Sequence, residues 1–211
     1  MNQTRVVALL ALSLALSGCA LLSKGEVPMR RYFSPDLPAA SSVAVPHANS
    51  ELRLGRVTAG AYIQERIMFR ESAHEVGFYD DRIWTEKPEA YLRRGLTRVL
   101  FEEQGLRSVM RGAGPTLDVE LIGFEEVKAP LHVGRVKIAF SLSDERVVSL
   151  QQTLTVERPI DAANPKAEPA AVAQALGEAL GVAIYEISGR VVGDLAKAPG
   201  TIAPCPVASS H

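Results

Sequence analysis

The sequence predicts an α/β domain with a mixed, largely antiparallel sheet and two main helices packed on one face. Several segments alternate apolar and polar residues, which is the period of strands that bury one side. Two longer segments repeat apolar residues every three or four positions, as amphipathic helices do. Because the other side of the alternating segments is polar, we expect helices to cover only one face of the sheet.

Three short strands are predicted at the start of the ordered body. Residues 52–57 alternate apolar and polar side chains. After a break at Ala59–Gly60, residues 66–70 are expected to form a second strand, and residues 77–79 a third, short one. We expect the acidic pair Asp80–Asp81 to turn the chain after this third strand.

The clearest helix is predicted between Thr85 and Gly105. Thr85 is expected to be its N-cap, Pro88 fits the first turn because its missing N–H would have no partner there, and Gly105 is a natural stop. One face of the segment is apolar and consists of Leu92, Leu96, Val99 and Leu100. The arginines of the segment lie off that face, so we expect an amphipathic core helix with a solvated charged side.

The best hairpin in the chain follows a strand predicted at 117–124. Apolar residues alternate with polar ones on both sides of a turn at 143–146. The residues expected on the apolar face are Val136, Ile138, Phe140, Leu142, Val148, Leu150, Leu154 and Val156. A hairpin with this pattern turns one face to the core and the other to water.

A second long helix is predicted from Pro169 to Leu195. Its apolar positions have helical spacing and are Val172, Leu176, Leu180, Ala183, Ile184, Ile187 and Val191. The glycines within it each cost about 1 kcal/mol relative to alanine, so we expect them to allow close approach to the sheet. Gly177 and Gly181 match the GxxxG pattern of membrane helices, but charged residues along the segment exclude a membrane-spanning helix.

Residues 1–18 are predicted to be a signal peptide. Their apolar run, Val6–Leu16, is shorter than the ~20 residues that span a bilayer. Two small residues, Ser17 and Gly18, stand directly before Cys19, and the stretch resembles the lipobox of bacterial lipoproteins. That resemblance implies cleavage before Cys19, a diacylglyceryl thioether on its sulfur and a third acyl chain on its amine. The alternative is an ordinary secretory signal with an incidental cysteine.

The mature chain is predicted to have three parts: a lipidated N-terminus and tether at 19–50, a domain at 51–197 and a disordered tail at 198–211. An aromatic island at 29–33 interrupts the tether, either as a strand at the sheet edge or as a patch on the domain surface. In the tail, Cys205 has no intramolecular partner if the first cysteine is lipidated. It is then either free or part of an intermolecular disulfide.

The charge balance argues against a nucleic-acid partner. Removing residues 1–18 deletes one of the 23 Lys and Arg and none of the 24 Asp and Glu, which leaves 22 against 24. Binding to nucleic acid or to anionic lipid headgroups calls for a clustered basic face, and this balance offers no case for one. We therefore expect membrane contact to come from the lipid anchor.

The sequence contains none of the common catalytic or metal-binding motifs. G-x-S-x-G, H-E-x-x-H, P-loop and C-x-x-C patterns are absent. His74 and His132 are separated by several elements and lack a neighbouring ligand at metal spacing. Adjacent carboxylates such as Glu125–Glu126 point to opposite sides of a strand and do not form a catalytic dyad. The sequence therefore predicts a binding protein and not an enzyme, with no catalytic residue, no metal and no cofactor beyond the lipid on Cys19.

Several segments resemble the family called ABC-type transport auxiliary lipoprotein component. They are Tyr32–Phe33, Ala61–Arg70, Tyr79–Pro88, Tyr91–Leu92 and Leu96–Leu106. The family-motif or partner-interface positions that the resemblance marks are Tyr62, Tyr79, Arg82, Trp84 and Pro88. Trp84, the only tryptophan, is expected in the core. In the family an arginine stands directly before the tryptophan, whereas Ile83 separates the two here, which leaves open which of them keeps the family's side-chain direction.

This resemblance implies an accessory role in transport. Members of the family resemble accessory subunits of MCE-type ABC systems that move lipids between the inner and outer membranes. The implied partners are an MCE-domain protein and, through it, an ABC permease and ATPase; a homo-oligomer is also open. Ala20, neutral and next to the acylated cysteine, implies sorting to the periplasmic face of the outer membrane. The alternatives are an envelope-assembly or scaffold lipoprotein without a link to lipid transport, and an unrecognised periplasmic hydrolase.

Overall fold

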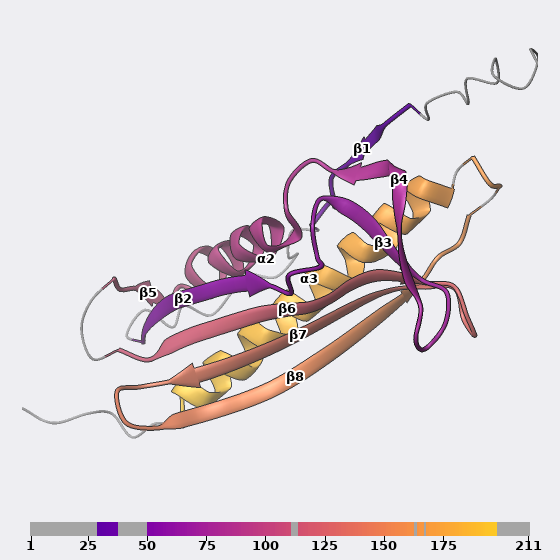
Figure 1. Ribbon diagram of the computed structural model, residues 1–211. Coiled ribbons are helices and arrows are strands. Elements are labelled where there is room, and N and C mark those ends of the chain that lie inside the picture. Colours follow the sequence, from indigo (N-terminus) through magenta and orange to yellow (C-terminus); the bar gives the residue numbers. More distant parts are fainter. Residues whose placement is uncertain (1–28, 38–49, 111–113, 163, 167, 198–211) are drawn as a thin grey trace, which may run out of the picture.

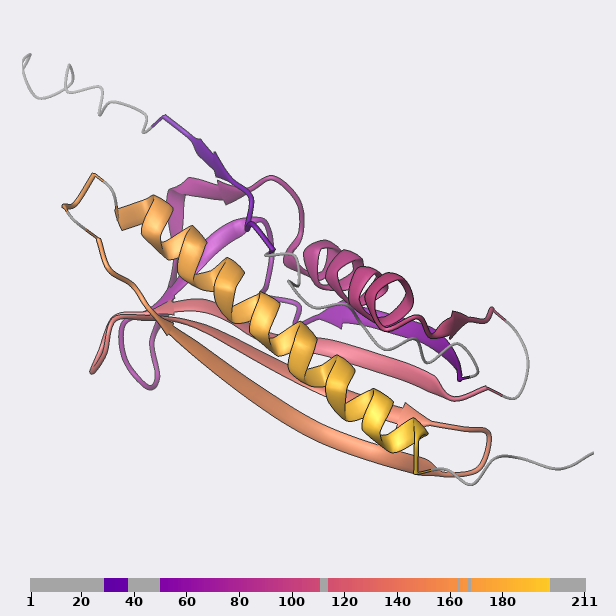
Figure 2. The ribbon, with the colours of Figure 1, turned by 180° about the vertical axis from the view of Figure 1, so that it is seen from behind.

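The computed structural model describes residues 29–37, 50–110, 114–162, 164–166 and 168–197. The predicted signal peptide, Cys19, the tail with Cys205 and much of the predicted tether lie outside these residues. Within them, the chain forms a mixed sheet of eight strands and two main helices (Figures 1 and 2). The predicted fold class is therefore confirmed.

The elements follow one another along the chain in a mixed order of strands and helices. The strands are β1 (Arg31–Phe33), β2 (Glu51–Ala59), β3 (Arg66–Arg70), β4 (Val76–Trp84), β5 (Arg107–Ser108), β6 (Thr116–Val127), β7 (Val133–Ser143) and β8 (Val148–Pro159). The helices are α2 (Pro88–Thr97), which continues as the π-helical segment η2 (Arg98–Glu103), and α3 (Glu168–Leu195).

β6 is the central strand of the sheet. One edge of β6 pairs antiparallel with β7, and β7 pairs in the same way with β8. The other edge pairs with two parallel strands in succession, β2 along its first half and β3 along its second. The long ladders are thus antiparallel, and the parallel pairs, which include β1 on β4 and β2 on β5, are shorter.

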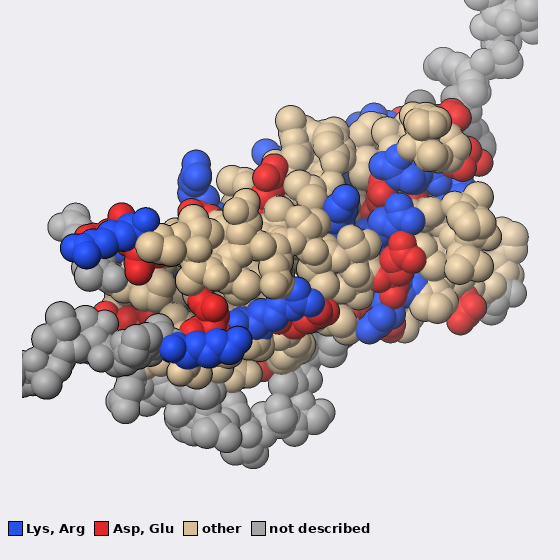
Figure 3. All heavy atoms as spheres, turned by 90° about the horizontal axis from the view of Figure 1, so that it is seen from below, with Lys and Arg blue, Asp and Glu red and all other residues tan. Residues whose placement is uncertain are grey.

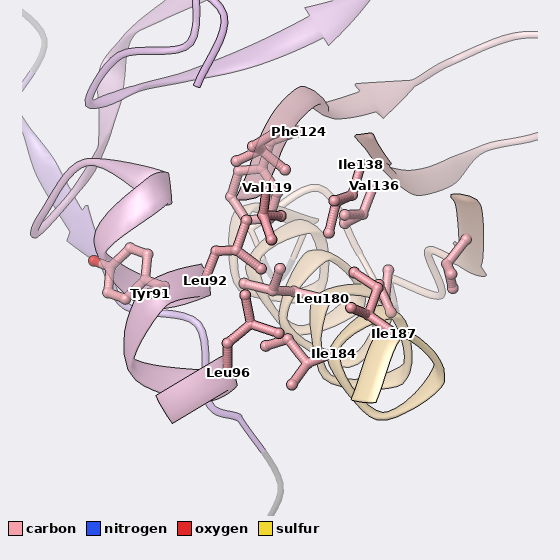
Figure 4. Packing of buried hydrophobic residues seen from close by; sticks show 14 of the residues in the cluster. Tyr91, Leu92, Leu96, Val119, Phe124, Val136, Ile138, Leu180, Ile184 and Ile187 are labelled. Carbon is pink, nitrogen blue, oxygen red and sulfur yellow. The ribbon is translucent and has the colours of Figure 1, made fainter. Parts of the chain in front are cut away.

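Both helices bury apolar side chains in a common core. α3 lies along β7 and β8, and α2 lies beside β2 and contacts α3. Where the helices meet, Leu92 is directed toward Leu180 and Leu96 toward Ile184 (Figure 4). The apolar face predicted for the first helix is confirmed, because Leu92, Leu96, Val99 and Leu100 are all 0% exposed.

The start of α2 differs from the prediction. Lys87, not Thr85, is the N-cap, and its side chain makes no capping hydrogen bond. Pro88 is the first helical residue, where the missing N–H costs nothing. The Thr85 hydroxyl instead lies 2.7 Å from the hydroxyl of Tyr91, which ties the chain ahead of the helix to the helix itself. Gly105, with φ 68°, follows η2 as the predicted stop.

Strand β4 corrects the prediction of a short strand at 77–79 that ends in an acidic turn. Asp80–Asp81 lie inside β4. Phe78 and Ile83 of β4 pair with β3 residues that are only two positions apart, so β4 carries extra residues between them. The extra residues bend the strand (Figure 1). Regular alternation is lost across this bend, and the predicted strand therefore ended too early.

The first residue of β8 faces the side opposite to the predicted one. Val148 was expected on the apolar face but is 54% exposed. β7 pairs Leu142 with Leu150 but Ser143 with Val148, so Ser149 is an extra residue, a β-bulge. The bulge shifts the alternation by one position and turns Val148 away from the core.

The predicted core positions of α3 are all buried, but three of its glycines, Gly177, Gly189 and Gly193, do not have the sheet as their nearest neighbour, as had been expected. A Cβ at Gly177 would come within 2.9 Å of the carbonyl oxygen of Asp36, so its close neighbour is the segment after β1 and not the sheet. At Gly189 and Gly193 a Cβ would meet nothing within 4 Å. α3 is long and apolar enough to cross a bilayer, but 61% of its most apolar window is buried, as in a core helix.

Candidate functional site

Segments that carry the family resemblance meet at one place in the fold. β1 pairs in parallel with the end of β4, so Arg31–Phe33 lie beside Arg82–Trp84. Of the two alternatives for the aromatic island, the strand at the sheet edge is the one that forms. The backbone N–H of Thr85 also donates to the carbonyl oxygen of Phe33, 2.9 Å away. This region, Arg31–Phe33 together with Tyr79–Pro88, is the β1–β4 junction.

Trp84 anchors the junction in the core. Its side chain is 2% exposed, as expected for a core tryptophan. Its ring centroid lies 5.1 Å from that of Phe124 on β6 and 6.4 Å, edge-on, from that of Tyr91 on α2. The Tyr91 hydroxyl also accepts the backbone N–H of Glu86 at 3.0 Å. Pro88, which is buried as well, then begins α2, so the core fixes both sides of this turn.

Arg82 connects the junction to the centre of the sheet and to α3. Its guanidinium carbon lies 3.7 Å from the centroid of the Tyr79 ring, a cation–π contact that the bend in β4 permits. Its Nη1 lies 3.5 Å from the carboxylate of Glu168, the first residue of α3, and 4.0 Å from that of Glu126 on β6. The Arg82 side chain is only 13% exposed, so these are partly desolvated charges.

Glu126 is a fully buried carboxylate, and its partners explain why the fold tolerates it. The Tyr79 hydroxyl donates to one of its oxygens at 2.8 Å, and Nε2 of His132 lies 2.7 Å from the other. Hydrogen bonds and the nearby guanidinium offset the desolvation of the charge. Burial, and then the bond to Glu126, raise the pKa of Tyr79 well above its usual value, so its hydroxyl remains a donor at physiological pH.

A β-bulge explains why alternation along the sequence does not predict Glu126 in the core. Ile122 is an extra residue in the ladder between β6 and β7. Before it, Leu121 is buried, and after it the buried position facing Trp84 is Phe124, which lies two residues from Glu126. The one local signal was Gly123, since a glycine inside a strand often marks a bulge.

Glu125 points to the opposite side of β6 from Glu126, as predicted for adjacent carboxylates on a strand. Its carboxylate accepts from Arg70, whose Nε lies 3.0 Å from Oε1 and whose Nη2 lies 2.9 Å from Oε2. Arg135 is a second cation, 3.7 Å away. The hydrogen bond to Glu125 raises the pKa of Arg70. The two carboxylates therefore belong to separate networks and form no dyad.

Among the residues that the structure describes, one group has ligand atoms close enough to suggest a metal. The ligand atoms of Glu126, His132 and Glu168 lie within 4.8 Å of one another, and carboxylates and imidazoles bind Zn²⁺. However, the guanidinium of Arg82 already stands beside both carboxylates, and a divalent cation would have to displace it. The arrangement is best explained as an ion-pair cluster of Tyr79, Arg82 and these three residues, the Arg82 cluster.

Tyr62 is placed differently from the other residues that the sequence marked. It lies after β2, and its hydroxyl donates to the carbonyl oxygen of Ile122 at 2.6 Å while half of the side chain is exposed. It thus ties the β2–β3 connection to the bulge of β6. The structure brings Tyr79 and Arg82 into one cluster and places Trp84 and Pro88 in the adjoining core.

Comparisons with solved structures find the same fold in other proteins. Protein XCC0632 from Xanthomonas campestris, described with the family name DUF330, matches with a TM-score of 0.65 and 22% identity over 77% of this chain and 99% of its own. An uncharacterized protein matches with a TM-score of 0.58 and 14% identity, over 77% of this chain and 99% of its own. The hypothetical protein CT253 from Chlamydia trachomatis matches with a TM-score of 0.51 and 11% identity, over 70% and 98%. No family model and no curated protein matches the chain.

These structural likenesses span nearly the whole of the other chains, so the shared unit is a complete domain. At such low identity they establish the fold alone. The residues of the domain and the segment that precedes it carry the information on function.

Proposed function

We propose that this chain is an outer-membrane-anchored periplasmic lipoprotein that serves as a non-catalytic accessory subunit of an MCE-type ABC system for lipid transport between the inner and outer membranes. The observation that carries the proposal is the β1–β4 junction. Two segments that resemble the ABC-type transport auxiliary lipoprotein component family, Tyr32–Phe33 and Tyr79–Pro88, are far apart in sequence but adjacent in space. The fold thus brings together two segments that the resemblance marks separately.

The lipobox supplies the second support, because it puts a membrane anchor a short distance from this junction. If residues 20–30 form the tether that their composition predicts, a coil of that length reaches about 18 Å. The pairing of β1 with β4 makes this shorter than the reach of about 30 Å for the whole segment up to Ser50. The domain would stay near the outer membrane, and an MCE-domain partner would meet it by reaching across the periplasm.

Arg82 of the junction and its partner Glu126 on β6 support a structural role more than a catalytic one. Arg82 and Glu126 are bonded to groups of the fold itself, and both are largely withdrawn from solvent. A general acid or base must be within reach of a substrate proton. Their position favours a protein in which these residues stabilise the fold and a binding surface carries the function.

Capture of the full-length chain from membranes in mild detergent tests the proposed partners. The expected co-purifying proteins are an MCE-domain protein together with an ABC permease and ATPase. Cys19→Ser is the matched control, because it removes the anchor without touching the domain, and it should lower the yield of all three. Recovery of envelope-assembly or scaffold proteins without any MCE-domain protein would contradict the role in lipid transport.

A further inference from the structure

β8 has an edge that pairs with no strand among the described residues. An open edge presents unpaired N–H and C=O groups, and proteins usually protect such edges with charges, prolines or short length. β1 and β5, with three and two residues, are protected by their shortness. β8 has twelve residues, and its stretch Val148–Val156 contains no charged residue, no proline and no glycine.

The protective features of this edge lie at its two ends: the bulge at Ser149 at the start of the strand, and Glu157, Arg158 and Pro159 at its end. From Leu150 onward the ladder with β7 is regular. Beside the edge, on the face of the sheet away from α3, a hollow is lined by Ala139, Ser141, Gln151 and Thr153 on its β8 side and by the charged residues Arg56, Asp118 and Glu120 on its far side. The view from below shows a tan surface bordered by rows of Lys, Arg, Asp and Glu (Figure 3). Between Leu150 and Val156 the edge is therefore regular and without charged residues.

We propose that this edge pairs with β8 of a second copy of the chain, antiparallel about a two-fold axis through Gln152, so that the two sheets become one. An interface of this kind must be self-complementary, because the same patch serves on both sides. The sequence of β8 meets that requirement in one register.

With Gln152 on the axis, residues of like character lie opposite each other. Leu150 faces Leu154 of the second copy, and Gln151 faces Thr153, so apolar pairs form on the helix side and polar pairs on the other. Moving the axis by one residue, to Thr153, would set Gln152 opposite Leu154. The side-chain pattern therefore selects the axis at Gln152.

Disulfide trapping of the full chain in its native membrane tests the register. In a Cys205→Ser background, Gln152→Cys should form a reducible dimer on mild oxidation, because directly opposed Cβ atoms are about 5 Å apart. Thr155→Cys is the matched control on the same strand, since six residues of offset separate the two copies by roughly 20 Å. Labelling with a maleimide confirms that both thiols are accessible. Equal trapping at both positions, no trapping at Gln152, or trapping to a different protein would each overturn the proposal.

A second measurement tests the dimer without any cross-link. Gln152→Lys places like charges directly opposite on the axis, so the purified full chain in detergent should sediment as a monomer where the parent is a dimer. Thr58→Lys, an exposed position on β2, is the control and should leave the dimer intact. A parent chain that sediments as a monomer would overturn the proposal, whatever the outcome for the transport partners.

Discussion

The buried carboxylate of Glu126 is bound by a few neighbouring side chains. Arg82→Ala should lower the free energy of unfolding by about 3–5 kcal/mol, because it removes the nearest guanidinium from a carboxylate that is 0% exposed. Urea unfolding of the purified chain measures this. Arg66→Ala is the matched control: its ion pair with Asp80 has side chains that are 47% and 80% exposed, so it should cost less than about 1 kcal/mol. Similar losses for both variants would show that Glu126 does not rely on Arg82.

Tyr79 adds a pH dependence whose sign follows from its raised pKa. Below the unfolded pKa of about 10, both states keep the proton and the contribution of the Tyr79 hydroxyl to stability is complete. Above it, the unfolded chain releases a proton that the folded chain retains, so stability falls as the pH rises. Tyr79→Phe cannot lose this proton. The difference in unfolding free energy between parent and variant should be constant up to about pH 9 and shrink above about pH 10. A difference that stays constant to pH 11 would contradict the buried, hydrogen-bonded hydroxyl.

At the scale of elements, the contact between α2 and α3 holds the helices over the sheet. Leu96→Ala should lower the free energy of unfolding by about 2–5 kcal/mol, since the side chain is 0% exposed and lies against Ile184. Thr97→Ala, at the neighbouring exposed position, is the control and should change it by less than about 0.5 kcal/mol. A loss below about 0.5 kcal/mol for Leu96→Ala would mean that this helix face is not part of the core.

The glycines of α3 give a second pair of contrasting variants. Gly189→Ala should stabilise the domain by about 0.5–1 kcal/mol, because alanine favours the helix and its Cβ meets nothing within 4 Å. Gly177→Ala should fail to give this gain, because its Cβ would lie 2.9 Å from the carbonyl oxygen of Asp36. Thermal unfolding measures both. An equal gain at the two positions would show that the segment after β1 is not docked on α3.

Elements were predicted well where their signal is local. The strand at 66–70 has the predicted bounds, and the apolar faces of both helices are buried where the 3.6-residue period put them. Two errors lie at irregular points, the bend of β4 and the bulge at Ser149, and a third concerns the N-cap of α2, which is Lys87 and not Thr85. A bulge is defined by the partner strand, which contributes an unequal number of residues. The alternation of residues in one strand does not show how its partner pairs with it, so it cannot predict a bulge.

At the scale of the whole molecule, the sequence also could not predict which side chains meet at the site. The family resemblance marked Tyr79, Arg82 and Trp84, which the structure places at one junction. It did not mark Glu126, His132 or Glu168, which belong to β6, the β6–β7 turn and α3. Their proximity follows from the central position of β6 and from where α3 begins. Neither feature is visible until the sheet order is known.

We propose that a lipid on Cys19 holds this domain at the outer membrane. Separation of inner and outer membranes by density, with the full chain quantified in each fraction, tests this most directly. Most of the parent protein should be in the outer-membrane fraction. Ala20→Asp should shift it to the inner membrane, because an acidic residue after the acylated cysteine commonly retains lipoproteins there. Cys19→Ser, which should no longer incorporate palmitate, controls for the anchor itself. Recovery of most of the parent protein in the inner-membrane fraction would contradict the account.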